Sequence, residues 1–63
     1  MKDEVMLVWY QKNRRWKAWK RYDEYTYTLI KTFVNTSSFI NESVMDYITY
    51  LMDRKINVVI KYE

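Results

Sequence analysis

The residues best suited to binding a ligand are concentrated in one short segment near the start of the chain. Residues 12–21 carry six cationic side chains and no acid, and two tryptophans lie among them. Nucleic-acid-binding proteins use cations to neutralise phosphates and flat side chains on which bases can stack. The segment therefore predicts a nucleic-acid site, whose candidate residues are Lys12, Arg14, Arg15, Lys17, Trp19, Lys20 and Arg21.

The same segment also fits a purely structural interpretation. As a strand it would place Trp16 and Ala18 on one face and Lys17, Trp19 and Arg21 on the other. Its cations would then keep a solvated surface soluble, with no ligand involved. Trp16 is the better candidate for the core, and Trp19, which has cations on both sides, is the better candidate for base stacking.

Groups for catalysis or metal binding are scarce in this sequence. The chain has no His and no Cys, which together with perturbed carboxylates perform most proton transfer and nucleophilic attack. Glu42 and Asp46 stand one turn apart on a predicted helix, but such a pair is more often a solvated helix face. The chain also lacks Gly, so the usual phosphate-binding loops cannot form. We therefore expect no enzyme activity, no metal and no cofactor.

The elements that would position the basic segment are three strands. Residues 5–10 are apolar on both alternating faces, which is typical of a strand covered on both sides. Residues 15–22 suit the second strand of a hairpin. Residues 25–34 alternate Thr with larger side chains, so that one predicted face carries Tyr25, Tyr27, Leu29 and Phe33.

A helix and a fourth strand follow these three. The helix is predicted to begin between Ser37 and Asn41, where a side-chain oxygen can cap it, and to end near Lys55. Val44, Ile48 and Leu51 recur at helical spacing and should face the sheet. Residues 56–62 then alternate as the last strand. Because the chain contains neither Gly nor Pro, turns are expected at Asn13, Asp23, Asn35 and Asn57.

This order predicts an α+β fold, a single β-β-β-α-β domain spanning residues 1–63. A helical crossover lets the last strand lie parallel to another strand of the sheet. Residues 5–10 are apolar on both faces, so they are the best neighbour for the last strand. We expect a mixed four-stranded sheet of order 3-2-1-4, with the helix packed on one face. A rival interpretation makes residues 13–25 helical, since Trp16, Trp19 and Tyr22 are three residues apart.

The size and composition of the chain lead to expectations about its partners. A domain of 63 residues has a small core, and without disulfides or a metal the remaining ways to stabilise it are oligomerisation or an unusually aromatic core. The chain carries three Trp, seven Tyr and two Phe, so we expect exposed aromatic surface and a homodimer. Its apolar runs are too short for a signal peptide or a transmembrane segment.

Two functions therefore remain open. The first is a non-catalytic binding protein that contacts nucleic acid through a basic aromatic hairpin. The alternative is a protein-interaction module of viral or phage type, or an inhibitor that docks on a host protein through an aromatic sheet face. The absence of Cys suits a cytoplasmic setting. The abundance of Lys, Ile, Tyr, Asn and Met suits an AT-rich genome, which points to a virus and its host cell.

Overall fold

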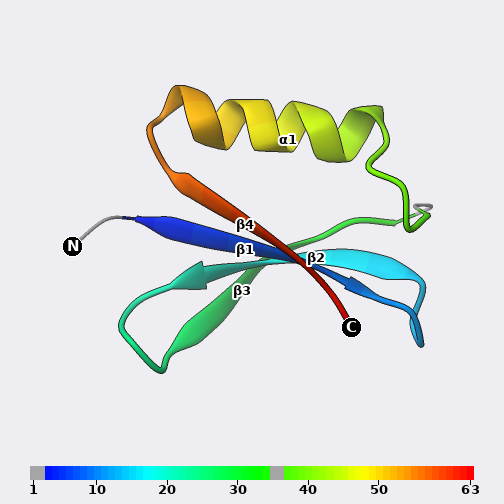
Figure 1. The fold of residues 1–63 in the computed structure, drawn as a ribbon, viewed down its shortest axis with the longest axis horizontal. Coiled ribbons are helices and arrows are strands. Elements are labelled where there is room, and N and C mark those ends of the chain that lie inside the picture. Colours follow the sequence, from blue (N-terminus) through cyan, green and yellow to red (C-terminus); the bar gives the residue numbers. More distant parts are fainter. Residues whose placement is uncertain (1–2, 35–36) are drawn as a thin grey trace.

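The computed structural model describes residues 3–34 and 37–63, which form a four-stranded sheet with one helix on one face (Figure 1). The elements are β1 (Glu4–Tyr10), β2 (Arg15–Arg21), β3 (Tyr27–Thr32), α1 (Glu42–Asp53) and β4 (Asn57–Tyr62). The sheet order is β3-β2-β1-β4, in which β1 runs antiparallel to β2 and parallel to β4. The α+β fold with sheet order 3-2-1-4 is thus confirmed, and the helical interpretation of residues 13–25 is wrong.

The central strand β1 contributes side chains to both faces of the sheet. Val5, Leu7 and Trp9 face the helix, while Met6 and Val8 face the other way. This two-sided burial explains why the strand is apolar at successive positions. The core between sheet and helix consists of Val5, Leu7, Trp9, Trp16, Ala18, Phe33, Val44, Ile48 and Leu51.

Aromatic side chains close one end of this core. The Trp16 ring lies 5.8 Å from the Trp9 ring and 5.3 Å from the Tyr62 ring, measured between centroids. The Trp16 indole donates a hydrogen bond to the carbonyl of Ser37 at 2.8 Å, and the Tyr62 hydroxyl donates one to the carbonyl of Ser38 at 3.4 Å. The segment that leads into α1 is thereby held over the aromatic end of the sheet.

Helix α1 begins where a side chain can satisfy a free backbone N–H. The Asn41 side chain accepts a hydrogen bond from the Val44 N–H at 3.0 Å, as an N-cap residue does. Val44, Ile48 and Leu51 are the buried residues of the helix. The predicted cap and the predicted sheet-facing side of the helix are both confirmed.

The helix ends through a left-handed residue. Lys55 has a φ of 61°, its N–H donates to the carbonyl of Met52 at 2.9 Å, and the next N–H, that of Ile56, donates to the carbonyl of Leu51 at 3.0 Å. This pair of bonds is a Schellman motif, which usually places Gly at the left-handed position. The turn predicted at Asn57 therefore occurs two residues earlier, and Asn57 is the first residue of β4.

Strand β3 contains a bulge that changes the expected orientation of its side chains. Trp19 of β2 pairs with Leu29 whereas Ala18 pairs with Lys31, so Ile30 is an extra residue in β3. The prediction that Leu29 and Phe33 share one face is consequently wrong. Phe33 lies in the core beneath the helix, and Leu29 lies on the opposite face.

The two hairpin turns use different chemistry. Between β1 and β2 the turn predicted at Asn13 is confirmed, and its left-handed residue is the next one, Arg14, with a φ of 53°. Between β2 and β3 the Asp23 carboxylate accepts hydrogen bonds from the N–H groups of Tyr25 at 2.9 Å and Thr26 at 2.8 Å. This confirms the turn at Asp23, whereas the one predicted at Asn35 lies outside the described residues.

Candidate nucleic-acid interface

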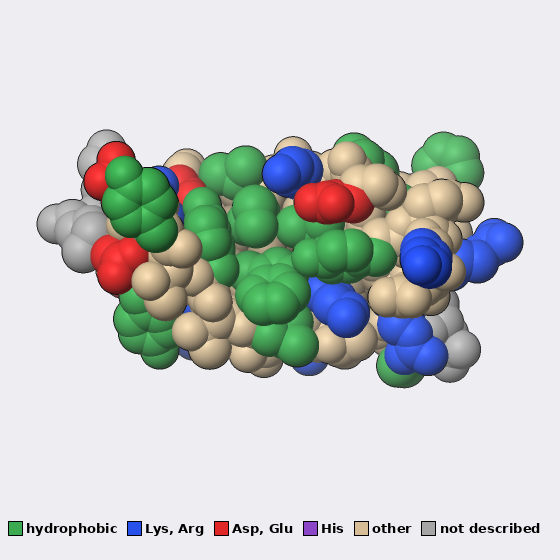
Figure 2. Space-filling view, turned by 90° about the horizontal axis from the view of Figure 1, so that it is seen from below, with side chains coloured by type: hydrophobic (Ala, Val, Ile, Leu, Met, Phe, Trp, Pro, Cys, Tyr) green, Lys and Arg blue, Asp and Glu red, His purple; other side chains and the backbone are tan. Residues whose placement is uncertain are grey.

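The sheet face opposite α1, called the open face below, carries most of the residues that could bind a ligand. Side chains alternate along each strand, so the strand register assigns them to this face. Figure 2 shows this face from below, with hydrophobic side chains across its middle and Lys and Arg side chains gathered toward the right. Its residues include Glu4, Met6, Val8, Tyr10, Arg15, Lys17, Trp19, Arg21, Tyr27, Leu29, Val59 and Lys61.

The middle of the open face is a row of apolar side chains that crosses all four strands. Met6 of β1 pairs with Trp19 of β2 on one side and with Val59 of β4 on the other, and Trp19 pairs in turn with Leu29 of β3. Leu29 and Val59 are exposed, and the other two are half-buried. We call this set, Leu29, Trp19, Met6 and Val59, the apolar row.

On one side of the apolar row the charges neutralise each other. The guanidinium of Arg21 lies 3.6 Å from the carboxylate of Glu4, and its Nε donates to the carbonyl of Asp23 at 3.0 Å. Tyr27 pairs with Arg21 and is exposed. This end of the open face therefore carries little free charge.

On the other side of the apolar row the charge is positive. Lys17 and Lys61 pair with Val8 from the two neighbouring strands, and Val8 is almost entirely buried between them. Further along, Arg15 pairs with Tyr10, and the Lys17 ammonium lies 5.3 Å from the centroid of the Tyr10 ring. A cation at this distance over an aromatic face is attracted to its negative centre.

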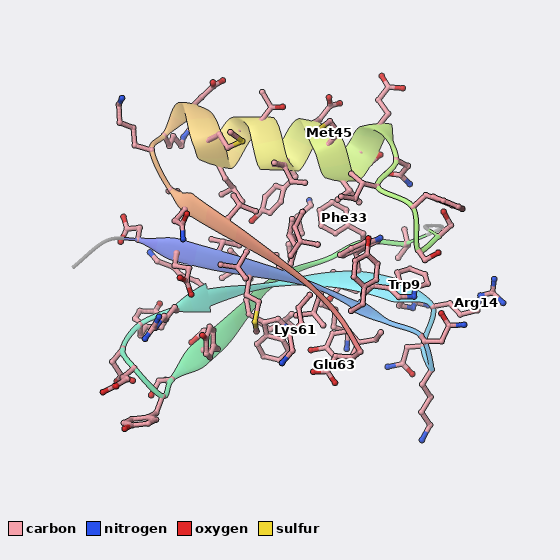
Figure 3. All side chains as sticks on the ribbon, in the orientation of Figure 1. Trp9, Arg14, Phe33, Met45, Lys61 and Glu63 are labelled. Atoms are coloured by element: carbon pink, nitrogen blue, oxygen red, sulfur yellow. The ribbon has the colours of Figure 1, made fainter. Side chains whose placement is uncertain are left out.

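The hairpin turn adds two more cations at this end. Lys12 and Arg14 are exposed in the turn, and Arg14 projects away from its tip (Figure 3). We call Lys12, Arg14, Arg15 and Lys17 together the basic end. Within the described residues, none of these four side chains forms an ion pair with a carboxylate, in contrast to Lys61, whose ammonium lies 3.7 Å from the Glu63 carboxylate. The basic end thus has uncompensated positive charge.

One of the seven candidate residues lies on the wrong face for this site. Lys20 pairs with Val5, whose side chain is in the core beneath the helix, so the Lys20 side chain leaves the sheet on the helix side. Its ammonium lies 5.7 Å from the centroid of the Tyr22 ring. The other six, Lys12, Arg14, Arg15, Lys17, Trp19 and Arg21, lie on the open face or in the adjoining turn.

Trp19 has an unusual polar environment. Its ring is half-buried within the apolar row, and its Nε1 is buried without a hydrogen-bond partner in the described residues. An unpaired buried N–H costs free energy that a phenyl ring in the same place would not. The indole is therefore held there by its apolar contacts, since its polar atom gains nothing.

Sequence reasoning missed three residues of this face. Tyr10 and Tyr27 add flat rings toward its two ends, and Lys61 adds a cation on β4. The position of Tyr10 could have been predicted from the sequence, because side chains alternate along a strand and Tyr10 therefore shares a face with Val8 and Met6. Lys61 becomes a neighbour only through the parallel pairing of β4 with β1.

A second cluster lies on the helix side, beside β3. The Lys31 ammonium lies 5.2 Å from the centroid of Phe33 and 5.6 Å from that of Tyr47, and the Tyr47 and Tyr50 rings stack at 6.2 Å. Burial, with the neighbouring Tyr50 hydroxyl, raises the pKa of Tyr47. These contacts are internal to the cluster and need no ligand.

The acidic side chains do not gather into a metal site in the described part of the chain. It contains no group of three or more acidic, His or Cys side chains placed to hold a metal ion. Glu42 and Asp46 are both exposed on α1. Among the described residues, no helix has the length and apolar character that crossing a bilayer requires.

Comparisons with known proteins provide no relative from which a function could be transferred. No protein-family model, no curated protein and no solved structure matches this chain. A function must therefore be argued from the chemistry of the open face and the basic end.

Proposed function

We propose that the protein binds nucleic acid, without catalysis, across the open face and the basic end. The observation that carries the proposal is the uncompensated charge of Lys12, Arg14, Arg15 and Lys17 at one end of a face that carries three flat aromatic rings. Phosphates release condensed counterions when such cations neutralise them, which gives affinity without sequence preference. The aromatic rings then give the bases a surface on which to stack.

The ligand of this surface is a single strand. Unpaired bases can be splayed onto aromatic side chains, whereas the bases of a duplex are already stacked on one another and would first have to be unstacked. Phosphates would contact the basic end, and bases would reach Tyr10 first and Trp19 next, since both rings lie on the same face. Tyr27 extends this path to the neutral end of the open face.

The test is a titration of labelled single- and double-stranded DNA and RNA at several salt concentrations. Wild-type protein should bind single strands best, with affinity that falls steeply as salt rises. The double variant Arg15→Gln, Lys17→Gln should reduce the salt slope by about one unit for each phosphate that is no longer neutralised. The matched control is Lys20→Gln, Lys31→Gln, which removes the same charge from the helix side of the sheet.

The outcomes separate a site from a general charge effect. A loss of nucleic-acid affinity that is confined to the Arg15→Gln, Lys17→Gln variant supports the proposal. Equal losses in both double variants would mean that only net charge matters. Absence of binding to every nucleic acid at low salt would overturn the proposal.

One observation favours the alternative, a protein-interaction module of viral or phage type that docks on a host protein. The open face has an apolar middle, and the Glu4–Arg21 ion pair lies at its edge, which is the anatomy of many protein interfaces. Such a partner would bind through Met6 and Leu29, and its affinity would depend little on salt. The variant Leu29→Lys should abolish protein binding while leaving polyanion binding intact or stronger.

Self-association is part of the proposal. A chain of 63 residues with many exposed aromatic side chains has a small core and gains stability from a partner. A homodimer would also present two open faces to one strand of nucleic acid, and two linked sites bind such a ligand more tightly than two separate sites. A cytoplasmic location, where single-stranded RNA is available, is consistent with this function.

A further inference from the structure

Within residues 3–34 and 37–63, the outer edge of β4 has backbone groups that are free to pair. Asn57 and Glu63 donate their N–H groups to the carbonyls of Asp3 and Trp9, at 3.0 Å and 2.9 Å. The odd-numbered residues of β4 therefore point their backbone groups toward β1. Because successive residues of a strand point their backbone groups to opposite sides, those that point away from β1 are Val58, Ile60 and Tyr62.

An exposed apolar flank of the helix lies above this edge. The Tyr47 ring contacts Phe33, with centroids 5.5 Å apart, so that flank of α1 faces the β3 side. Helical geometry puts Met45 and Met52 on the opposite flank, on the β4 side. They are 49% and 64% exposed. Figures 1 and 3 look toward this side of the molecule, where β4 passes in front of the other strands beneath α1.

We propose that a second copy of the chain docks on this side, with the two β4 strands antiparallel and the two α1 helices adjacent. The pairing would satisfy the outward backbone groups of Val58 and Ile60 in both copies. It would also bury the two methionines and Ile60, which is 43% exposed. A shallow groove lined by Met52, Ile56 and Val58, among others, runs between the helix end and the strand and would be covered as well.

A second copy suits this surface better than an unrelated strand because a two-fold axis brings complementary groups together. In antiparallel pairs, residues directly opposite each other have their side chains on the same face of the sheet. Val59 can therefore lie on the two-fold axis, directly opposite Val59 of the other copy. Lys61 then faces Asn57, so two lysines are not opposed. The same register sets Val58 opposite Ile60 of the other copy, twice per dimer, so that apolar side chains meet on the helix side of the pair.

The other free edge of the sheet is less suitable. Strand β3 has the bulge at Ile30, which interrupts the regular spacing of its backbone groups. All six of its residues are exposed, and the backbone of α1 lies close to β4 rather than to β3, so the helix would add less to an interface at this edge. Pairing of β4 with itself closes a two-fold dimer, whereas pairing of β4 with β3 would propagate into a fibre.

The test compares matched substitutions on the two edges by sedimentation equilibrium. Ile60 and Ile30 are equally exposed, each at 43%, on β4 and β3 respectively. Wild-type protein should be dimeric at about 100 μM, a concentration that detects weak association. Ile60→Lys should make it monomeric, and Ile30→Lys should leave it dimeric. A monomeric wild type, or a dimer that only Ile30→Lys disrupts, would overturn the proposal.

Two further variants keep the test independent of damage to β4. Met52→Lys changes the helix flank alone and should also weaken the dimer, while circular dichroism reports an unchanged fold. Val59→Lys should weaken the dimer as well, with circular dichroism again unchanged, because the two copies of this exposed residue would bring like charges together on the two-fold axis. A Val59→Lys protein that stays fully dimeric would overturn the register centred on Val59.

This inference rests on the self-association in the proposed function and not on nucleic-acid binding. The basic end lies on the hairpin turn and β2, away from the outer edge of β4. Monomeric Ile60→Lys should therefore still bind a short oligonucleotide. A monomeric Ile60→Lys protein that still binds supports both proposals, whereas a dimeric wild-type protein that binds no nucleic acid overturns the proposed function and supports the interface.

Discussion

The indole N–H of Trp16 donates to the carbonyl of Ser37 at 2.8 Å, which ties β2 to the segment that leads into α1. Trp16→Phe keeps a ring in the core but removes this bond, and it should lower the free energy of unfolding by about 1–3 kcal/mol. Trp19→Phe should cost less, because the Trp19 N–H has no partner to lose in the described residues. Urea denaturation of both variants measures the difference, and equal losses would contradict it.

Trp19 should also separate base stacking from structure. Trp19→Ala should weaken single-strand binding by about 1–3 kcal/mol if a base stacks on the ring. Trp19→Phe keeps a flat ring and should retain most of the affinity. Binding is measured by fluorescence anisotropy, after thermal unfolding has shown that each variant folds. If Trp19→Ala fails to fold, Trp19 is a structural residue and the stacking role must be withdrawn.

One substitution at the end of α1 should make the protein more stable. Lys55 is left-handed at the position where Gly has no steric penalty, so Lys55→Gly should raise the free energy of unfolding by about 1 kcal/mol. Lys55→Ala removes the same charge but keeps a β-carbon, and it should change stability little. Thermal and urea unfolding test both variants. A stabilising effect of Lys55→Ala alone would show that charge, not conformation, matters here.

The helix should tolerate substitutions on one side only. Leu51 is buried against the sheet, and Leu51→Ala should cost about 2–5 kcal/mol, which is enough to unfold much of a domain this small. Asp46 is exposed, and Asp46→Ala should be nearly silent. Urea denaturation monitored by circular dichroism compares them. Similar effects of the two substitutions would mean that the helix packs on a different side.

The turn at Asp23 should respond to acid. The Tyr25 N–H, and next the Thr26 side chain, hydrogen-bond the Asp23 carboxylate and lower its pKa. Since the folded protein prefers the ionised form, this contribution to stability is complete above the usual Asp pKa of about 3.9 and is lost as pH falls through the lowered value. The Tyr25 and Thr26 amide resonances should shift over that range. In Asp23→Asn those pH-dependent shifts should disappear.

Much of the fold follows from local pattern. The doubly apolar stretch of β1 could be recognised as a central strand because burial on both faces leaves no polar alternation. Asn41 could be recognised as a helix cap because its side chain competes for backbone N–H groups. For the site, alternation in β2 predicted that Lys17 and Trp19 share a face. It also puts Lys20 on the face of Trp16, so Lys20 could have been excluded from the sequence alone.

The rest depends on tertiary packing. The bulge at Ile30 moves Phe33 into the core, and the Thr alternation of that segment gives no sign of an extra residue. Arg14 and Lys55 adopt left-handed conformations although Asn residues stand close by, because the hairpin register and the helix end set those positions. Lys61 joins the open face only once β4 has paired with β1. No local signal predicts any of these outcomes.

The pairing of β1 with β4 also has a consequence for how the chain folds. These strands are far apart in the sequence, so their pairing closes a long loop that contains every other element. During synthesis the β1–β2 hairpin can form early, but one side of the central strand stays unpaired until β4 has left the ribosome. Until then Val5, Leu7 and Trp9 lack their neighbours Val58, Ile60 and Tyr62, and the nascent chain is more vulnerable to aggregation and proteolysis than the complete fold.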